Sequence, residues 1–174
     1  MAFSGGDERA WVRGAQKGSV SDLEALFRAH WPRAYRAAYL VVHDAAAAED
    51  IAQEAFLAAV RALDRFDRRR PFAPWLHRIA VNRAIDWARA RELRREVELV
   101  APPGVSPPEP ADPEPLAAGL AELSPEHRAV IVLRYLLDYS PGEIASLLDL
   151  PRGTVNSRLR RGLDRLGEQL ESES

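Results

Sequence analysis

A proline-rich, acidic stretch divides the 174-residue chain into two short parts. It reads VELVAPPGVSPPEPADPEPLAAG, residues 97–119, and contains seven prolines and four acidic residues. Because a residue that precedes proline avoids the helical region, this stretch favours extended backbone, and it shows no helical stripe. We interpret it as a linker between modules at residues 21–96 and 120–170, with residues 1–20 as an N-terminal extension. Each module is large enough for only one small core.

Both modules carry local signals for helix starts. Residues 21–24 (SDLE) and 140–143 (SPGE) match the capping box, in which a serine N-cap is followed three residues later by glutamate. Ser124 precedes proline, as at the first turn of many helices. Asp44 can cap the next helix, and a further helix or helix pair is expected over residues 72–95. Apolar residues after Asp44 follow helical spacing: Ile51, Ala55, Phe56, Ala59, Val60 and Leu63. No run alternates with period two, so we expect an all-α fold of two small helical domains.

The charge of the chain is segregated along the sequence. The net charge is only −2, but residues 61–95 carry 11 basic and 4 acidic residues, whereas residues 96–126 carry 7 acidic and no basic residues. A segregated pattern of this kind defines separate surfaces, and one of them is basic enough for nucleic acid. The chain has no cysteine, which excludes disulfides and thiolate zinc sites. Without an apolar run of about 20 residues or a signal peptide, we expect no membrane insertion and a cytoplasmic location.

The segment PRGTVNSRLRRGLDRL, residues 151–166, predicts a helix with one apolar and one cationic side. Its apolar stripe is Val155, Leu159, Leu163 and Leu166. The preceding segment SPGEIASLLDL predicts a short capped helix with Ile144, Leu147 and Leu148 inward, and DLP predicts a tight turn. Two short helices in this order match a helix-turn-helix that places its second helix in the major groove. The candidate DNA-binding residues are Thr154, Asn156, Ser157, Arg158, Arg160 and Arg161. The alternative is a solvated basic face on a structural helix.

The basic segment RFDRRRPFAPWLHRIAVNRAIDWARARELRR interleaves arginines with aromatic residues. The aromatic and histidine positions are Phe72, Trp75, His77 and Trp87. Cations hold phosphates and aromatic rings stack on unpaired bases, so this composition fits a site for single-stranded DNA. The alternative is that many of these side chains are core, and we expect this of Trp75, Leu76, Ile79 and Ala80.

The segment EDIAQEAFLAAVR places an apolar residue among polar ones on the exposed side of a helix. The residues that share this side are Asp50, Gln53, Glu54, Leu57 and Arg61. An exposed leucine flanked by carboxylates and an amide suits a protein interface. The alternative is a solvated acidic face with no partner.

SPGEIASLLDLPRGTVNSRLRRGLDRL resembles region 4 of extracytoplasmic-function (ECF) sigma factors, which belong to the sigma-70 family. HDAAAAEDIAQEAFLAAVRAL and FAPWLHRIAVNRAIDWARAR are similar to the parts of region 2 that dock on RNA polymerase and open the promoter −10 element. The resemblance implies two partners, core RNA polymerase, through its β′ clamp helices and β flap, and promoter DNA. It implies −35 binding by the helix-turn-helix and polymerase binding by the face around Leu57. The −10 set that it implies is Arg78, Asn82, Arg83, Asp86, Trp87 and Arg89, with Asn82 holding a flipped base. An anti-sigma factor that clamps the two modules together is a further hypothesis.

Three residues depart from the pattern of that family. Asn156 stands where a basic residue is common, and Leu150 stands where glycine is common. Gly162 stands where alanine is usual, which weakens a helix by up to about 1 kcal/mol. These departures leave the expected fold unchanged and affect the −35 sequence preference.

Other classes of function fit the sequence less well. The acidic residues near His43 do not converge on one helix face, and the chain has no phosphate-binding glycine loop or nucleophile elbow. We therefore expect no catalytic residue, no metal site and no cofactor. A two-domain helix-turn-helix regulator that acts without joining polymerase is the main alternative, but it leaves the face around Leu57 without a role. A helical adaptor that does not touch DNA leaves the arginines without one.

Overall fold

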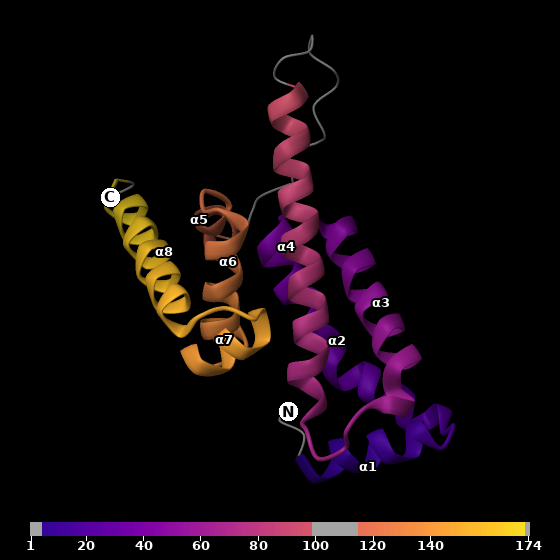
Figure 1. The fold of residues 1–174 in the computed structure, drawn as a ribbon. Helices are drawn as coiled ribbons and strands as arrows, with labels where there is room; N and C mark the ends of the chain where they lie inside the picture. Colours follow the sequence, from indigo (N-terminus) through magenta and orange to yellow (C-terminus); the bar gives the residue numbers. More distant parts are fainter. Residues whose placement is uncertain (1–4, 99–114, 173–174) are drawn as a thin grey trace.

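The computed structural model describes residues 5–98 and 115–172, and each secondary-structure element in these ranges is helical (Figure 1). The expected all-α fold is thus confirmed. The elements of the N-terminal module are α1 (Gly5–Gln16), α2 (Val20–Val42), α3 (Ala45–Ala62), the 3-10 turn η1 (Leu63–Arg65) and α4 (Phe72–Glu98). Those of the C-terminal module are α5 (Pro115–Ala121), α6 (Pro125–Ile131), the π-helical turn η2 (Val132–Leu136), α7 (Pro141–Leu148) and α8 (Arg152–Ser172).

Helices α2, α3 and α4 pack side by side, and α1 crosses one end of this bundle (Figure 1). The predicted N-terminal extension, residues 1–20, is thus mostly a packed helix, and Val12 is only 2% exposed. Glu8 of α1 accepts a hydrogen bond from the Phe72 N–H at 2.8 Å and pairs with His30 Nε2 at 3.0 Å. The hydrogen bond with His30 is the main cause that lowers the pKa of Glu8. Helix α1 therefore holds the start of α4 in place.

Helix starts were predicted correctly at two of three N-terminal positions. Asp44 caps α3, because its Oδ1 accepts from the Ala47 N–H at 2.9 Å. A single helix, α4, covers residues 72–95. The capping box expected at residues 21–24 is wrong, because the N-cap is Ser19, whose Oγ accepts from the Asp22 N–H at 3.3 Å. Gly18, at φ 87°, reverses the chain directly after α1, and α2 can therefore begin two residues earlier.

The predicted linker, residues 97–119, is helical at both of its described ends. Residues 97–98 continue α4, and residues 115–119 belong to α5. Residues 99–114 lie outside the described residues. Ala117 and Leu120 are 2% and 1% exposed, so burial of an apolar face stabilises α5, although its sequence is short and follows several prolines.

The helix-turn-helix has the expected caps and turn. Ser140 Oγ accepts from the Glu143 N–H at 3.3 Å, and Glu143 Oε2 accepts from the Ser140 N–H at 2.8 Å, which confirms the capping box. Helix α7 ends at Asp149 in the left-handed region, at φ 54°. Aspartate tolerates this conformation. Because Asp149 takes the left-handed position, Leu150 does not, and residue 150 therefore does not need to be glycine.

Two residues expected in apolar stripes are exposed. In α8, Val155 and Leu159 are buried as expected, but Leu163 is 41% exposed and Gly162 is buried instead. Gly162 faces Ile131 of α6, and its missing side chain allows the two helices to approach, which turns Leu163 outward. In α3, Val60 is 40% exposed, because Ala59 and Leu63 occupy the inward positions.

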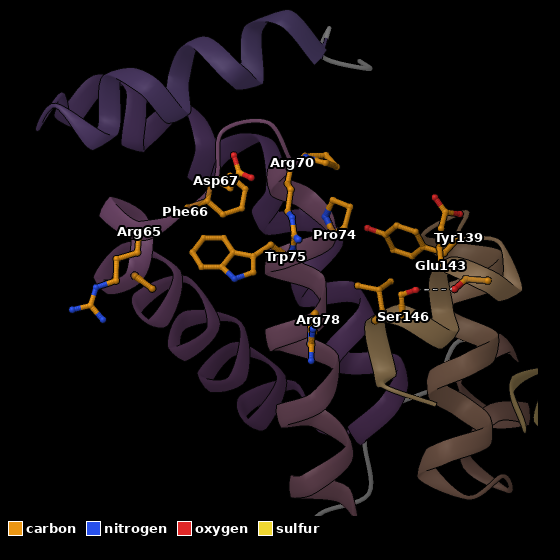
Figure 2. Close-up of a pocket in the computed structure, with 14 residues that line it drawn as sticks. Arg65, Phe66, Asp67, Arg70, Pro74, Trp75, Arg78, Tyr139, Glu143 and Ser146 are labelled. Carbon is orange, nitrogen blue, oxygen red and sulfur yellow. Dashed lines mark hydrogen bonds between the residues drawn. The ribbon is translucent and has the colours of Figure 1, made fainter. Parts of the chain in front are cut away.

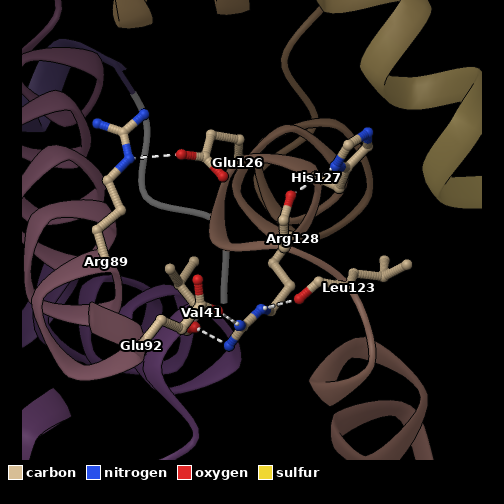
Figure 3. Close-up of polar contacts among 8 residues, drawn as sticks. Val41, Arg89, Glu92, Leu123, Glu126, His127 and Arg128 are labelled. Carbon is tan, nitrogen blue, oxygen red and sulfur yellow. Dashed lines mark hydrogen bonds and ion pairs between the residues drawn. The ribbon is translucent and has the colours of Figure 1, made fainter. Parts of the chain in front are cut away.

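The two modules pack against each other along α2 and α4. One continuous apolar cluster includes Val41 of α2, Val81 and Ile85 of α4, and Leu120, Val130 and Leu133 of the C-terminal module. Arg128, only 6% exposed, lies at this junction. Its guanidinium donates to the backbone oxygens of Val41 at 2.6 Å and Leu123 at 2.9 Å, and to Glu92 at 3.1 Å (Figure 3). A buried cation with three acceptors thus links the end of α2 to α6.

Among the helices of residues 5–98 and 115–172, none combines the length with the apolar composition that crossing a membrane requires.

Candidate functional site

Helix α8 presents the predicted −35 set on its outer side. Asn156, Arg160 and Arg161 are exposed, and Thr154, Ser157 and Arg158 are half-buried. The opposite side of the helix packs on α6 and α7 through Val155 and Leu159, so the orientation of the polar side is determined by burial. In Figure 1, α8 lies at the edge of the molecule, with α6 between it and α4. An exposed helix side with arginine, asparagine and hydroxyl groups can contact phosphates and base edges.

Arginines of α8 also place positive charge beside the contact between α6 and α8. Burial lowers the pKa of His127 on α6, and the charges of Arg158, Arg161 and Arg165 lower it further, while that of Glu126 opposes them. The Ser124 hydroxyl and His127 Nδ1 form a hydrogen bond at 2.6 Å. The sequence did not predict that His127 lies beside the α8 arginines, because α6 approaches α8 only through tertiary packing.

Helix α3 presents the predicted polymerase set to the outside. All five residues, Asp50, Gln53, Glu54, Leu57 and Arg61, are exposed. Leu57 is 53% exposed, and Val60 beside it adds apolar surface that the stripe pattern had assigned to the core. The face therefore combines an apolar centre with polar neighbours, as protein interfaces do.

The predicted −10 set does not form one face of α4. Arg83, Asp86 and Trp87 line a cleft of about 440 Å³ between α3 and α4, together with Asp50 and Glu54. Arg83 Nη1 donates to Glu54 Oε2 at 2.5 Å, so a residue of the predicted DNA set is paired with a residue of the predicted polymerase set. The Arg91 guanidinium lies 5.2 Å from the centre of the Trp87 ring, as in a cation–π contact. The other three members of the −10 set, Arg78, Asn82 and Arg89, lie on another side of α4.

Arg78, Asn82 and Arg89 are spaced so that they share one stripe of α4. Arg78 is exposed and lines the cavity described below, and Asn82 is half-buried. Arg89 donates through Nε to Glu126 of α6 at 2.5 Å (Figure 3). This stripe thus borders the junction between the two modules.

A cavity of about 750 Å³ lies at that junction. Figure 2 shows the segment around Phe66 and the first turns of α4 on one side, and Tyr139, Glu143 and Ser146 on the other. The rings of Phe66 and Trp75 stack with centroids 4.6 Å apart. Arginines stand around these rings: Arg65, Arg70 and Arg78. Rings and cations in one cavity match the chemistry of an unstacked, negatively charged strand.

Several residues of the basic segment are core, as the alternative interpretation held. Phe72, Leu76 and Ala80 are buried, whereas Trp75 and Ile79 are only half-buried. His77 is 3% exposed, and its Nδ1 forms a hydrogen bond with the Tyr139 hydroxyl at 2.8 Å. Burial lowers the pKa of His77 to about 4 and raises that of Tyr139, so both groups are neutral at pH 7. The contact joins the modules without a net charge.

Two segments match described protein families. Residues 26–94 match Sigma-70 region 2, and residues 114–166 match Sigma-70, region 4. The chain is 33% identical to the ECF RNA polymerase sigma factor SigW of Bacillus subtilis, with 91% of this chain and 94% of SigW covered. It is 33% identical to the RNA polymerase sigma factor CarQ of Myxococcus xanthus, with 88% and 91% covered.

Solved structures agree with these matches. CnrH in complex with the cytosolic domain of CnrY is similar with a TM-score of 0.74 and 30% identity, and the alignment covers 97% of this chain and 99% of CnrH. The sigma factor RpoE from Bartonella quintana, in complex with the anti-sigma factor NepR, is similar with a TM-score of 0.70 and 22% identity, over 89% and 100% of the two chains. At that identity the second match supports the fold alone.

Proposed function

The chain belongs to the ECF group of the sigma-70 family and directs RNA polymerase to promoters, and from this premise we propose which surface makes each contact. Region 2 lies within the N-terminal module, which ends with α4, and region 4 comprises α5 to α8, residues 115–172, with the linker between α4 and α5. The N-terminal module binds core polymerase and the melted −10 strand, and the C-terminal module binds the −35 element.

The exposed face of α3 binds the β′ clamp helices of core polymerase. Its apolar centre, Leu57 and Val60, supplies area that leaves water on binding, while Asp50, Gln53 and Arg61 supply polar contacts at the rim. Glu54 already holds Arg83, so this pair couples the polymerase face to α4.

The stripe of Arg78, Asn82 and Arg89 on α4 holds the melted −10 strand. Arginines at both ends can hold phosphates, and the half-buried Asn82 amide between them can form hydrogen bonds with a flipped base. Removing a base from the stack costs a few kcal/mol, which contacts of this kind offset. Arg83, Asp86 and Trp87 line the cleft between α3 and α4, and they act on the melted strand from there.

The polar side of α8 reads the −35 element in the major groove. The observation that carries this assignment is the orientation of the helix, with Val155 and Leu159 buried while Asn156, Arg160 and Arg161 face outward. Arginine pairs bidentately with guanine and asparagine with adenine, so this face can distinguish sequences. A linker joins the two DNA-binding surfaces, so each raises the effective concentration of the other once polymerase has aligned them.

Further partners follow from the same premise. The β flap of polymerase is the expected binding site of the C-terminal module, and an anti-sigma factor is the expected inhibitor. CnrH, which is 30% identical to this chain, likewise forms a complex with a second protein, the cytosolic domain of CnrY. The chain supplies recognition and no enzymatic step, because nucleotide addition belongs to polymerase. Polymerase acts in the bacterial cytoplasm, so the chain acts there too.

The proposal is tested by mixing the purified protein with bacterial core polymerase and a library of promoter fragments. We expect co-elution in gel filtration and transcripts from a subset of fragments that share −35 and −10 sequences. Failure to co-elute, or transcripts that start equally well without the protein, would disprove the proposed function.

A further inference from the structure

Helix α1 lies against the loop that joins η1 to α4 (Figure 1). This loop comprises residues 66–71, and most of its side chains are exposed. At its start, Gln16 of α1 donates through Nε2 to the Phe66 backbone oxygen at 3.1 Å. At its end, Glu8 accepts from the Phe72 N–H at 2.8 Å. Two side chains of one helix therefore hold both ends of the loop.

The two side chains lie at opposite ends of one stripe of α1. Glu8, Val12 and Gln16 are four residues apart, so they share one side of the helix. Val12, at the centre of the stripe, is 2% exposed, and Gln16 also donates to the Leu63 oxygen at 2.8 Å. The hydrogen bond with His30 is the main cause that keeps the pKa of Glu8 below its usual value, so its carboxylate is ionised at pH 7 and is a strong acceptor. The stripe thus has a buried apolar centre and a hydrogen-bonding group at each end.

An apolar cluster fixes the position of α1 on the bundle. Val12 belongs to this cluster together with Leu26 of α2 and Phe72 of α4. The match to Sigma-70 region 2 begins at residue 26, after α1, so the family does not assign a role to this helix. Its role follows from its contacts, and the polar ones go to the loop and to the start of α4.

The loop forms part of the wall of the cavity of about 750 Å³. Phe66 and Arg70 line the cavity from the loop, and the Phe66 ring stacks on that of Trp75 with centroids 4.6 Å apart. Arg78, which also lines the cavity, stands one turn of α4 before Asn82. All of these residues belong to the N-terminal module. Its side of the cavity therefore adjoins the position proposed for the flipped base, and a neighbouring base can reach it.

The precision of such a site depends on how firmly its walls are held. Side chains that bind a ligand must stay within about 0.5 Å of the productive geometry, and loops are less precise supports than helices. The two hydrogen-bonding side chains of α1 supply the support that residues 66–71 lack within their own sequence.

We propose that Glu8 and Gln16 are positioning residues for −10 recognition. By holding the ends of the loop, they determine the shape of the cavity and thereby the preference for the base that enters it. The inference rests on the proposed function, which assigns the melted strand to the stripe that contains Arg78 and Asn82. It gives α1 a part in promoter selectivity, although this helix touches no base itself.

The first test measures the mobility of the loop in the free, full-length protein. The chain contains no cysteine, so Arg68→Cys, at an exposed position of the loop, accepts a single spin label. We expect Glu8→Met and Gln16→Met, which remove the hydrogen bonds and keep a long side chain, to shorten the rotational correlation time of the label about twofold. Glu8→Gln keeps an acceptor for the Phe72 N–H and should leave the mobility at the native value. Native mobility in both methionine variants would overturn the proposal.

The second test measures the base preference at each −10 position. Run-off transcription with core polymerase is compared on promoters in which each −10 position carries each of the four bases in turn. We expect Glu8→Met and Gln16→Met to reduce the preference at one −10 position about threefold to tenfold, as the loss of one hydrogen bond would. The −35 preference should change less than twofold, and Glu8→Gln should retain the native −10 preference. A lower stability alone would reduce transcription from all promoters in proportion and would leave the preference unchanged.

Val12→Ala is the matched control for stability, because it removes buried apolar volume from the same stripe and leaves both hydrogen-bonding side chains in place. It should lower the free energy of unfolding and keep the native preference at every −10 position. An equal loss of preference in Val12→Ala, or a native preference in both methionine variants, would refute the positioning role.

The label mobility is measured without polymerase or DNA, so it reports the hold of α1 on the loop even if the proposed function fails. That failure would appear separately, as the absence of promoter-specific transcripts with native protein, and the part of α1 in −10 recognition would be refuted with it.

Discussion

Gly162 of α8 faces Ile131 of α6 so closely that a β-carbon at Gly162 would lie 2.7 Å from Ile131 Cδ1. Alanine at this position adds up to about 1 kcal/mol of helix propensity but overpacks the α6–α8 contact, which costs about 1–3 kcal/mol. We therefore expect Gly162→Ala to lower the free energy of unfolding by about 1 kcal/mol. Urea denaturation of the purified variants measures this change.

Ile131→Val removes Cδ1 and provides the control. In that background we expect Gly162→Ala to become neutral or stabilising, with a coupling energy of about 1–2 kcal/mol in the double-mutant cycle. If the effects of the two substitutions are additive, the contact with Ile131 does not explain why residue 162 is glycine.

The capping box of α7 predicts a dependence of stability on pH. Hydrogen bonding to Ser140, through its side chain and then its backbone N–H, holds the pKa of Glu143 below its usual value. A carboxyl whose pKa is lower in the folded state stabilises the fold above its unfolded pKa of ~4.3, and this stabilisation is lost as the pH falls through the folded-state value. We expect Glu143→Ala to destabilise the protein at pH 7 and to have a smaller effect at pH 3, as measured by thermal unfolding. In a Ser140→Ala background this difference between the two pH values should become smaller, because the side-chain hydrogen bond is lost while the backbone N–H of residue 140 remains.

The parts of the fold that the sequence predicted are those that depend on nearby residues. The Ser140–Glu143 box, the Asp44 cap and the burial of Val155 and Leu159 each involve residues within one or two turns. The contacts that position the modules join residues far apart, as when Arg128 donates to the Val41 oxygen 87 positions away. A periodic pattern in one helix contains no information about such partners.

The candidate sites, like the fold, were predicted where they depend on nearby residues and missed where they depend on contacts between distant residues. The outward side of α8 and the exposed face of α3 follow from helical spacing. All five predicted residues of α3 are exposed, and those of α8 are exposed or half-buried. The −10 set did not stay together, because Arg83 and Trp87 turn toward α3 while Arg89 meets Glu126. Which neighbour covers each side of α4 depends on tertiary packing, and spacing along one helix does not determine it.

We expect the exposed side chain of Leu57 to contribute to the affinity for core polymerase. The side chain is 53% exposed, so Leu57→Ala should leave the melting temperature unchanged. If the residue is buried against polymerase, the loss of three carbons lowers the affinity for core polymerase by about tenfold. Fluorescence titration with labelled protein measures the dissociation constant. Val20→Ala, at a 77% exposed position on α2, should bind like the native protein, and equal losses for both variants would contradict the assignment of the face.

We expect the side chain of Arg161 to contribute to the preference for particular −35 sequences. We expect Arg161→Ala to weaken −35 recognition by about 1–3 kcal/mol and to relax the preference at one base pair. Arg165→Ala removes the same charge from an exposed position on the same helix, outside the proposed set, and should affect all sequences weakly and equally. Run-off transcription with polymerase on promoters that vary at −35 distinguishes the two. An unaltered promoter preference in Arg161→Ala would place the reading surface elsewhere.

We expect the amide of Asn82 to contribute to the opening of the −10 element. Its side chain is half-buried on α4 between Arg78 and Arg89, so loss of its amide removes about one hydrogen bond to a flipped base, worth about 0.5–1.5 kcal/mol. We expect Asn82→Ala to lower the permanganate reactivity of −10 thymines about three- to tenfold while −35 occupancy in footprints stays normal. Asn156→Ala on α8 is the reciprocal control, since it should lower −35 occupancy, with opening reduced only in proportion. Native reactivity in Asn82→Ala at equal occupancy would show that the melted strand does not depend on this amide.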